Sequence, residues 1–119
     1  SDRRQRQMCI RDRFKNQIGE LNIAPLKSYN QSLALDYEIH PNVKKSWGYG
    51  VIINDQPLAE GRSAGSGSWA GVLNTYFWVD YKNDLAGVFL TQVLPCYTGQ
   101  LLEAFKSFEK LSYKNFNKG

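Results

Sequence analysis

The chain has 119 residues, 42% of them hydrophobic and 22% charged, which is typical of one small globular domain. This composition excludes a disordered tail, and no stretch reaches the roughly 20 apolar residues of a membrane-spanning helix. The formal charge of +4 is concentrated in residues 1–13, which hold five Arg and two Asp, whereas the remainder is nearly neutral. This distribution argues against nucleic acid as a partner.

The first thirteen residues, SDRRQRQMCIRDR, differ from the rest of the chain in more than charge. Residues 3–13 resemble, without a gap, the translation of a common transposase sequencing adapter. The other interpretation is a basic, disordered arm that binds an acidic surface. We expect residues 1–13 not to belong to the folded domain, and residues 14–119 to be the C-terminal part of a longer domain. Cys96 is then the single cysteine, so no disulfide is expected within residues 14–119.

Residues 14–46 have no sustained hydrophobic period. The stretch FKNQIGELNI, residues 14–23, predicts a short helix that ends at Gly19 and is followed by a loop. A turn is expected at residues 40–42, because a residue that precedes proline avoids helical geometry.

Three later segments are rich in β-branched and aromatic residues and predict strands. They cover residues 47–54, residues 68–79 with a break near 72–74, and residues 85–93. A charged turn, DYKND at residues 80–84, separates the last two. Short turns between neighbouring strands favour an antiparallel meander.

A helix is predicted over residues 99–112, with Thr98 as its N-cap. Lys106, Glu109 and Lys110 fall mostly off its apolar face. That face is made by residues at helical spacing, namely Leu101, Leu102, Phe105, Phe108 and Leu111. Such a face must be buried, so we expect it to pack on the sheet. The predicted fold class is α/β of the α+β type, an antiparallel sheet with a packed C-terminal helix.

Few side chains indicate chemistry on their own. His40 has no second His or Cys at a metal-ligand spacing, so we expect a solvated turn histidine. Cys96 lacks a His partner in the pattern, which predicts an inert thiol. Asp80 and Asp84 fit a solvated hairpin better than an acid–base pair. The glycine-rich residues 61–68 lack the Lys-Ser/Thr ending of a phosphate-binding loop, so neither a metal site nor a phosphate site is predicted.

Four segments carry a pattern when they are taken together. They are NQIGELNI (16–23), KKSWGYGVIIN (44–54), GRSAGSGSWAGVLNTYFWVD (61–80) and LAGVFLTQVLP (85–95). Their most specific part is the series W-x-G, N-T-Y-x-W-x-D and G-V-x-x-T-Q. In this order the segments resemble the C-terminal part of the serine β-lactamase-like superfamily, nearest to class C-like hydrolases such as family VIII esterases, D-aminopeptidase and penicillin-binding-protein-like enzymes. The resemblance implies a partial β-lactamase/transpeptidase-like fold.

The resemblance also implies a role for the triplet Trp69-Ala70-Gly71. In the family this strand forms one wall of an acyl-transfer site, and the N–H after the Gly of the motif donates to the oxyanion. That donor would be Val72, and Trp69, Ala70 and Gly71 would bind the substrate. Gly71 would leave clearance, while Trp69 would line the acyl pocket. With no Lys in the triplet, neutral esters or amides are expected as small-molecule substrates, and no metal or organic cofactor is implied.

In the family a Ser-x-x-Lys at the start of a helix supplies the nucleophile and its base, and a Tyr assists proton transfer. We expect these elements to lie outside this chain, since Tyr29-Asn30 has neither the spacing nor the position of the family's Tyr. The prediction is therefore part of a serine hydrolase that works through an acyl-enzyme, with this chain inactive alone. The alternative is a non-catalytic, penicillin-binding-protein-like relative that binds a ligand. A cytoplasmic and a periplasmic location are both compatible with the sequence.

Overall fold

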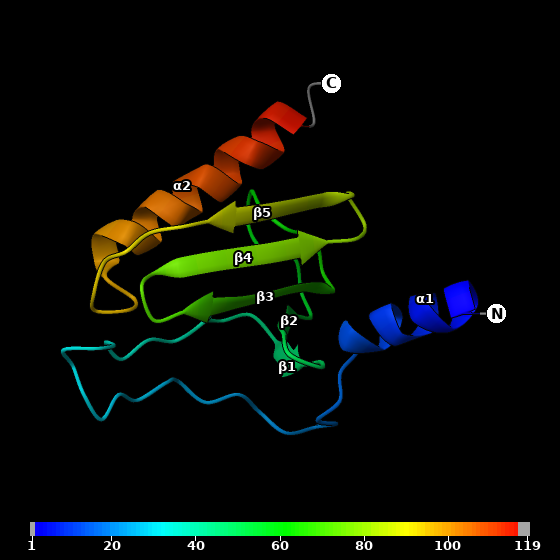
Figure 1. The fold of residues 1–119 in the computed structure, drawn as a ribbon, viewed down its shortest axis with the longest axis horizontal. Coiled ribbons are helices and arrows are strands. Elements are labelled where there is room, and N and C mark those ends of the chain that lie inside the picture. The colour runs from blue at the N-terminus through cyan, green and yellow to red at the C-terminus, as the bar shows by residue number, and fades with distance from the viewer. Residues whose placement is uncertain (1, 117–119) are drawn as a thin grey trace.

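The structure, a computed structural model, describes residues 2–116 and contains one antiparallel sheet and two helices. The elements are α1 (Asp2–Arg13), β1 (Lys45–Trp47), β2 (Ile52–Asn54), β3 (Ser66–Gly71), β4 (Thr75–Asp80), β5 (Leu85–Phe89) and α2 (Gly99–Phe116). The five strands pair in the order β1-β2-β3-β4-β5, and every pair is antiparallel (Figure 1). The predicted meander with a C-terminal helix is confirmed.

The strand predicted over residues 47–54 is wrong, because this stretch is a hairpin. β1 ends at Trp47, and the chain turns before β2 begins at Ile52. Gly50 has a φ of 86°, which a glycine adopts without the steric cost of a Cβ. The N–H of Gly48 donates to the Val51 carbonyl over 2.9 Å and closes the turn. Strand-forming residues on both sides of the two glycines hide this turn in the sequence.

The break predicted near residues 72–74 is confirmed. β3 ends at Gly71 and β4 begins at Thr75, while Asn74 has a φ of 59° in the turn between them. The last strand is shorter than predicted, since β5 ends at Phe89.

The segment before β1 contains no helix after α1. Residues 14–44 are turns and extended chain, so the predicted helix ending at Gly19 is wrong. α1 is a helix, yet none of its residues is buried. Its contact with the sheet is made at its end, where the Tyr49 N–H donates to the Arg13 carbonyl over 3.1 Å. α1 therefore projects away from the sheet (Figure 1).

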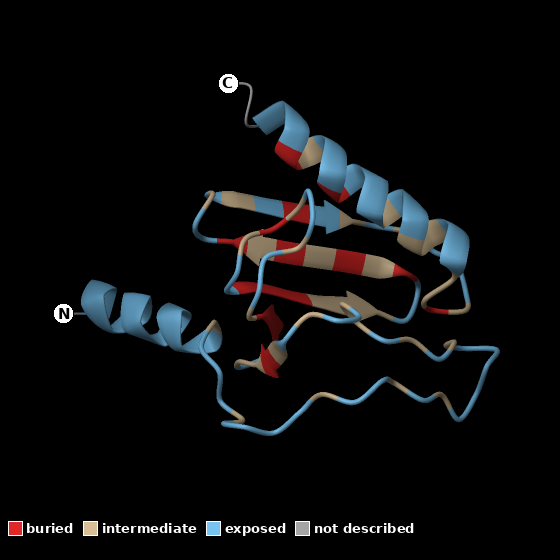
Figure 2. Ribbon diagram, turned by 180° about the vertical axis from the view of Figure 1, so that it is seen from behind, coloured by how far each residue is buried: buried red, intermediate tan, exposed pale blue. Residues whose placement is uncertain are grey.

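The core lies between α2 and one face of the sheet. Burial alternates along β4, where Tyr76, Trp78 and Asp80 are buried and the residues between them are partly exposed (Figure 2). Trp78 is 0% exposed, and its ring contacts those of Phe105 and Phe108 at centroid distances of 5.7 and 5.6 Å. Aromatic contacts of this kind dominate the packing energy of a small core.

The helix packs through a different row of residues than its apolar spacing predicts. Glu109 is buried, whereas Leu111 is 54% exposed, which corrects the predicted face at these two positions. The packed row continues to Tyr113, whose hydroxyl accepts a hydrogen bond from Trp78 Nε1 over 3.0 Å. Thr98 precedes the helix, but its hydroxyl donates to the Pro95 carbonyl instead of accepting a first-turn N–H.

Replacing Gly87 by Ala is expected to destabilise the chain, because a Cβ at Gly87 would overlap the Trp78 ring. The ring is enclosed by α2 and cannot withdraw, so we expect a loss of about 1–3 kcal/mol in the free energy of unfolding, measured in urea. Gly99→Ala is the matched control, since a Cβ there meets open space at the start of a helix. Equal stabilities of the two variants would contradict this account.

The face of the sheet opposite α2 is covered at one end by Phe14. A Cβ on Gly67 would overlap the Phe14 ring, and that ring contacts Tyr81 edge-on at 4.7 Å. Farther along, Val88 is 61% exposed. Within residues 2–116, this face thus carries apolar side chains without a packed layer above them.

Candidate functional site

The predicted oxyanion donor, Val72, lies in the turn directly after β3. Its side chain is 52% exposed, and no acceptor for its N–H is present among residues 2–116. A backbone N–H in this situation is available to a ligand. The geometry therefore leaves free the donor that the sequence singles out.

The triplet before Val72 does not present all its side chains to one place. Ala70 pairs with Tyr76, which faces α2, and side chains alternate along a strand, so Trp69 and Gly71 face the other side. Trp69 is half-buried, and its ring contacts that of Trp47 edge-on at a centroid distance of 4.7 Å. Trp69 and Gly71 thus share a face, and Ala70 does not share it.

Gly71 has a structural role that the sequence does not reveal. A Cβ at this position would overlap Oγ1 of Thr75, its partner across the hairpin. The carbonyl of Gly71 also accepts a hydrogen bond from the Cys96 thiol over 3.3 Å. The glycine is therefore required by the hairpin itself, independently of any substrate.

Asn74 holds the turn that contains Val72. It is 0% exposed, and its Nδ2 donates to the carbonyls of Val93 and Pro95 over 2.7 Å each. Its Oδ1 accepts from the Tyr76 hydroxyl over 2.6 Å and from the Thr98 N–H over 3.2 Å. One side chain thus fixes the turn to the segment that leads into α2.

Two further residues tie the same turn down. The Thr91 hydroxyl donates to the Leu73 carbonyl, and it also lies 3.2 Å from the Asn74 carbonyl oxygen. Cys96 is buried, and burial raises the pKa of its thiol, so it stays protonated at neutral pH. The motif residues Asn74, Thr91 and Trp78 therefore act as supports of the Val72 turn and the core below it.

Asp80 is not the solvated hairpin residue that the sequence predicts. It is 1% exposed and accepts hydrogen bonds from Ser63, Asn83 and the Tyr113 hydroxyl, the last over 2.7 Å. Burial opposes ionisation, but the hydrogen bonds outweigh it and hold the pKa of Asp80 well below its usual value. The ionised carboxylate joins the loop before β3, the turn after β4 and α2.

A buried ion pair joins the loop before β3 to α2. Arg62 Nε donates to Glu109 Oε2 over 3.0 Å, and Nη2 donates to Oε1 over 2.5 Å. The Arg62 N–H also donates to Oε2, and both side chains are buried. The guanidinium lies 5.5 Å from the centroid of the Trp78 ring. In the sequence, the charge of Glu109 among the apolar residues of α2 could have indicated a buried pair. No sequence spacing identifies Arg62 as its partner.

His40 is also not a solvated turn residue. Its ring is half-buried, and its Nε2 is buried without a hydrogen-bond partner in the described part of the chain. Burial, and then the positive charge of Arg62, lower the pKa of His40 from 6.5 to about 4. The imidazole is therefore neutral at pH 7.

His40 and Asp80 predict two pH windows for stability. Unfolding raises the pKa of His40 from about 4 to about 6.5, so stability is lost as the pH falls from 6.5 to 4. The pKa of Asp80 is lowered by folding, so its contribution is lost below about pH 4. In urea titrations at pH 7, 5 and 3, His40→Gln should flatten the upper window and Asp80→Asn the lower one.

The charges that face His40 come from several elements of the fold. They are those of Arg62, Glu109, Lys45 and Lys106. If His40→Gln kept the full loss of stability between pH 6.5 and 4, the loss would come from another group.

The spacings Ser-x-x-Lys and Tyr-x-Asn, which carry the reacting groups in the family, both occur in the chain. The structure does not bring these residues together into a site. Ser107 and Lys110 have the Ser-x-x-Lys spacing, yet they lie in the middle of α2, both exposed, and Lys110 pairs with Glu60. Tyr81 and Tyr113 each precede Asn by two positions. Tyr113 is buried against Asp80, and neither residue follows a helix-initial Ser in chain order.

Among residues 2–116 no group of three or more His, Cys, Asp or Glu side chains is placed to hold a metal ion. Neither helix in this range has the length and apolarity that crossing a membrane requires.

Part of the chain is similar in structure to part of simvastatin synthase (LovD) of Aspergillus terreus. The LovD6 mutant matches with a TM-score of 0.64 at 26% identity, over 65% of this chain and 20% of that enzyme. The unliganded enzyme matches with a TM-score of 0.63 at 25% identity over the same shares. LovD has a serine β-lactamase/transpeptidase-like fold. The chain has part of the β-lactamase-like fold.

The chain spans about a fifth of the length of these enzymes. No family model matches it, and no curated protein matches it. The chain thus combines part of a β-lactamase-like fold with a Val72 N–H that has no acceptor among residues 2–116.

Proposed function

We propose that this chain forms one wall of the acyl-transfer site of a serine hydrolase or acyltransferase with a β-lactamase-like fold. The observation that carries the proposal is the Val72 N–H, which has no hydrogen-bond acceptor among residues 2–116 and lies at the end of the Trp69-Ala70-Gly71 strand. Acyl transfer places negative charge on the carbonyl oxygen of the substrate, and a preorganised backbone N–H stabilises that charge. Asn74 and Thr91 supply the preorganisation by holding the turn.

The remaining residues of the triplet have different roles in this proposal. Trp69 shares the face of Gly71 and would line the acyl pocket with its indole ring, beside Trp47. Ala70 faces α2, so it would contribute through its backbone. Because no Lys stands in the triplet, a neutral ester or amide is the proposed substrate class.

The nucleophile, its base and the assisting Tyr would come from sequence outside this chain, and the chain alone would be inactive. The partly uncovered sheet face supports this, because Val88 and its apolar neighbours are available for packing against a further layer. The match to a fifth of the LovD enzymes is consistent with such an arrangement.

The test uses a protein in which this chain is joined to an upstream part that carries Ser-x-x-Lys. In that protein the substitution Val72→Pro removes the Val72 N–H. Hydrolysis of a p-nitrophenyl ester and mass-spectrometric trapping of the acyl-enzyme are the measurements. Binding of the ester with no acylation, in the unsubstituted protein, would favour the non-catalytic ligand-binding alternative.

A further inference from the structure

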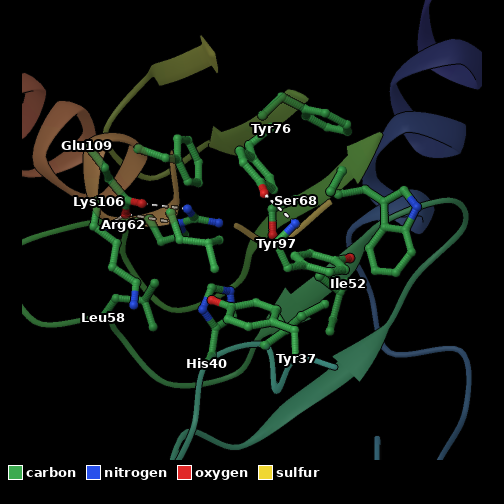
Figure 3. Close-up of a pocket in the computed structure, with 16 residues that line it drawn as sticks. Tyr37, His40, Ile52, Leu58, Arg62, Ser68, Tyr76, Tyr97, Lys106 and Glu109 are labelled. Atoms are coloured by element: carbon green, nitrogen blue, oxygen red, sulfur yellow. Dashed lines mark hydrogen bonds and ion pairs between the residues drawn. The ribbon is translucent and has the colours of Figure 1, made fainter. Parts of the chain in front are cut away.

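A cavity of about 100 Å³ lies on the α2 side of the sheet, apart from the Val72 turn. In Figure 3, His40 and Tyr37 lie across the cavity from the Arg62–Glu109 pair. Lys106 of α2 also lines the cavity. Its lining includes Trp69 and Ala70 of the triplet, but Val72 does not line it.

Arg62 has one nitrogen that its ion pair does not use. Nε and Nη2 donate to Glu109, whereas Nη1 is buried and has no partner among the described residues. The whole side chain is 2% exposed. A buried N–H without an acceptor is costly, so an acceptor in the cavity would be favourable.

His40 offers a second unpaired nitrogen to the same cavity. Its Nε2 is buried without a partner in residues 2–116, and the neutral imidazole can carry a proton there. The stacked rings of Tyr37 and Tyr97, with centroids 4.7 Å apart, form a flat apolar wall nearby. Two polar groups beside an aromatic wall are typical of small-molecule sites.

The charge of the lining selects a monoanion. Glu109 is the carboxylate in the lining, and both its oxygens are hydrogen-bonded to Arg62. Because Arg62 and Glu109 cancel, Lys106 gives the lining a net charge of one positive. A ligand with one negative charge is balanced by it, whereas a dianion would keep one buried charge without a counter-ion. The volume corresponds to roughly three water molecules or to a carboxylate of about two to four carbons.

We propose that this cavity binds a small monocarboxylate whose oxygens accept hydrogen bonds from Arg62 Nη1 and His40 Nε2. The apolar end of the ligand lies against Tyr37 and Tyr97. Ordered water is the competing occupant, and the experiment separates the two.

The experiment titrates the 119-residue chain with sodium acetate and sodium butyrate at constant ionic strength. His40 is the single histidine, so its imidazole NMR signals report the cavity without ambiguity. We expect a saturable, one-site shift with both carboxylates and none with chloride or 1-butanol. A linear drift, or equal shifts with chloride, would overturn the proposal and leave water as the occupant.

The double variant Arg62→Met with Glu109→Met replaces the ion pair by apolar groups of similar volume. It should weaken carboxylate binding at least tenfold, whereas Lys110→Met, on the same helix but outside the cavity, should bind as the unsubstituted chain does. Unchanged binding by the double variant would contradict the assignment. If that variant does not fold, the comparison of acetate with chloride and 1-butanol still decides. None of these outcomes depends on acyl transfer.

Discussion

Replacing Glu109 by Gln is expected to lower the free energy of unfolding by about 3–5 kcal/mol, because the Arg62 guanidinium then stays buried without its counter-ion. The substitution also removes the charge that accepts the Arg62 N–H. The loop before β3 loses its connection to α2 as a result. Urea unfolding of the two proteins at pH 7 measures the difference.

The chain offers a matched control on the same helix. Lys110 and Glu60 form an ion pair at 2.9 Å, but their side chains are 58% and 66% exposed. Exposed pairs contribute about 0–1 kcal/mol, so Lys110→Gln should change the stability little. A comparable loss in both variants would show that burial does not set the cost of breaking the Arg62–Glu109 pair.

Replacing Val72 by Pro is expected to lower kcat/KM of the complete enzyme about 100- to 1000-fold, the effect of removing one oxyanion-hole donor. Pro has no N–H, whereas the side chain of Val72 is half exposed and contributes little packing. The loss should appear mainly in kcat, because the interaction is made in the transition state.

Val72→Ala is the control, since it shortens the side chain and keeps the N–H. We expect its activity to stay within about threefold of the unsubstituted enzyme. Circular dichroism and urea unfolding must show that Val72→Pro keeps its fold. A folded Val72→Pro protein with full activity would remove Val72 from the proposed mechanism.

Local patterns in the sequence were sufficient for most of the fold. Alternating aromatic and β-branched residues predicted β4, and helical spacing predicted α2, because both patterns reflect the geometry of single elements. They were not sufficient for the β1–β2 hairpin, where Gly48 and Gly50 turn a stretch of strand-forming residues back on itself. The predicted strand there was wrong because strand propensity does not show that Gly50 adopts a positive φ.

The candidate site was also predicted only in part from the sequence. The triplet Trp69-Ala70-Gly71 and Val72 could be selected from the sequence by a family resemblance, since the motif is contiguous. The sequence did not show which of Trp69 and Ala70 faces α2, or that a Cβ on Gly71 would overlap Thr75. Those facts depend on which strand lies beside β3.

The sequence by itself determined the class of fold, the antiparallel pairing of successive strands and the position of the Val72 turn, because these follow from neighbouring residues. Only the tertiary structure decided that Arg62 meets Glu109, 47 positions away, and that Asp80 is buried beneath Tyr113. It also brought His40 to the cavity beside Arg62. Contacts between charged groups far apart in the chain form when the core closes, and no local periodicity encodes them.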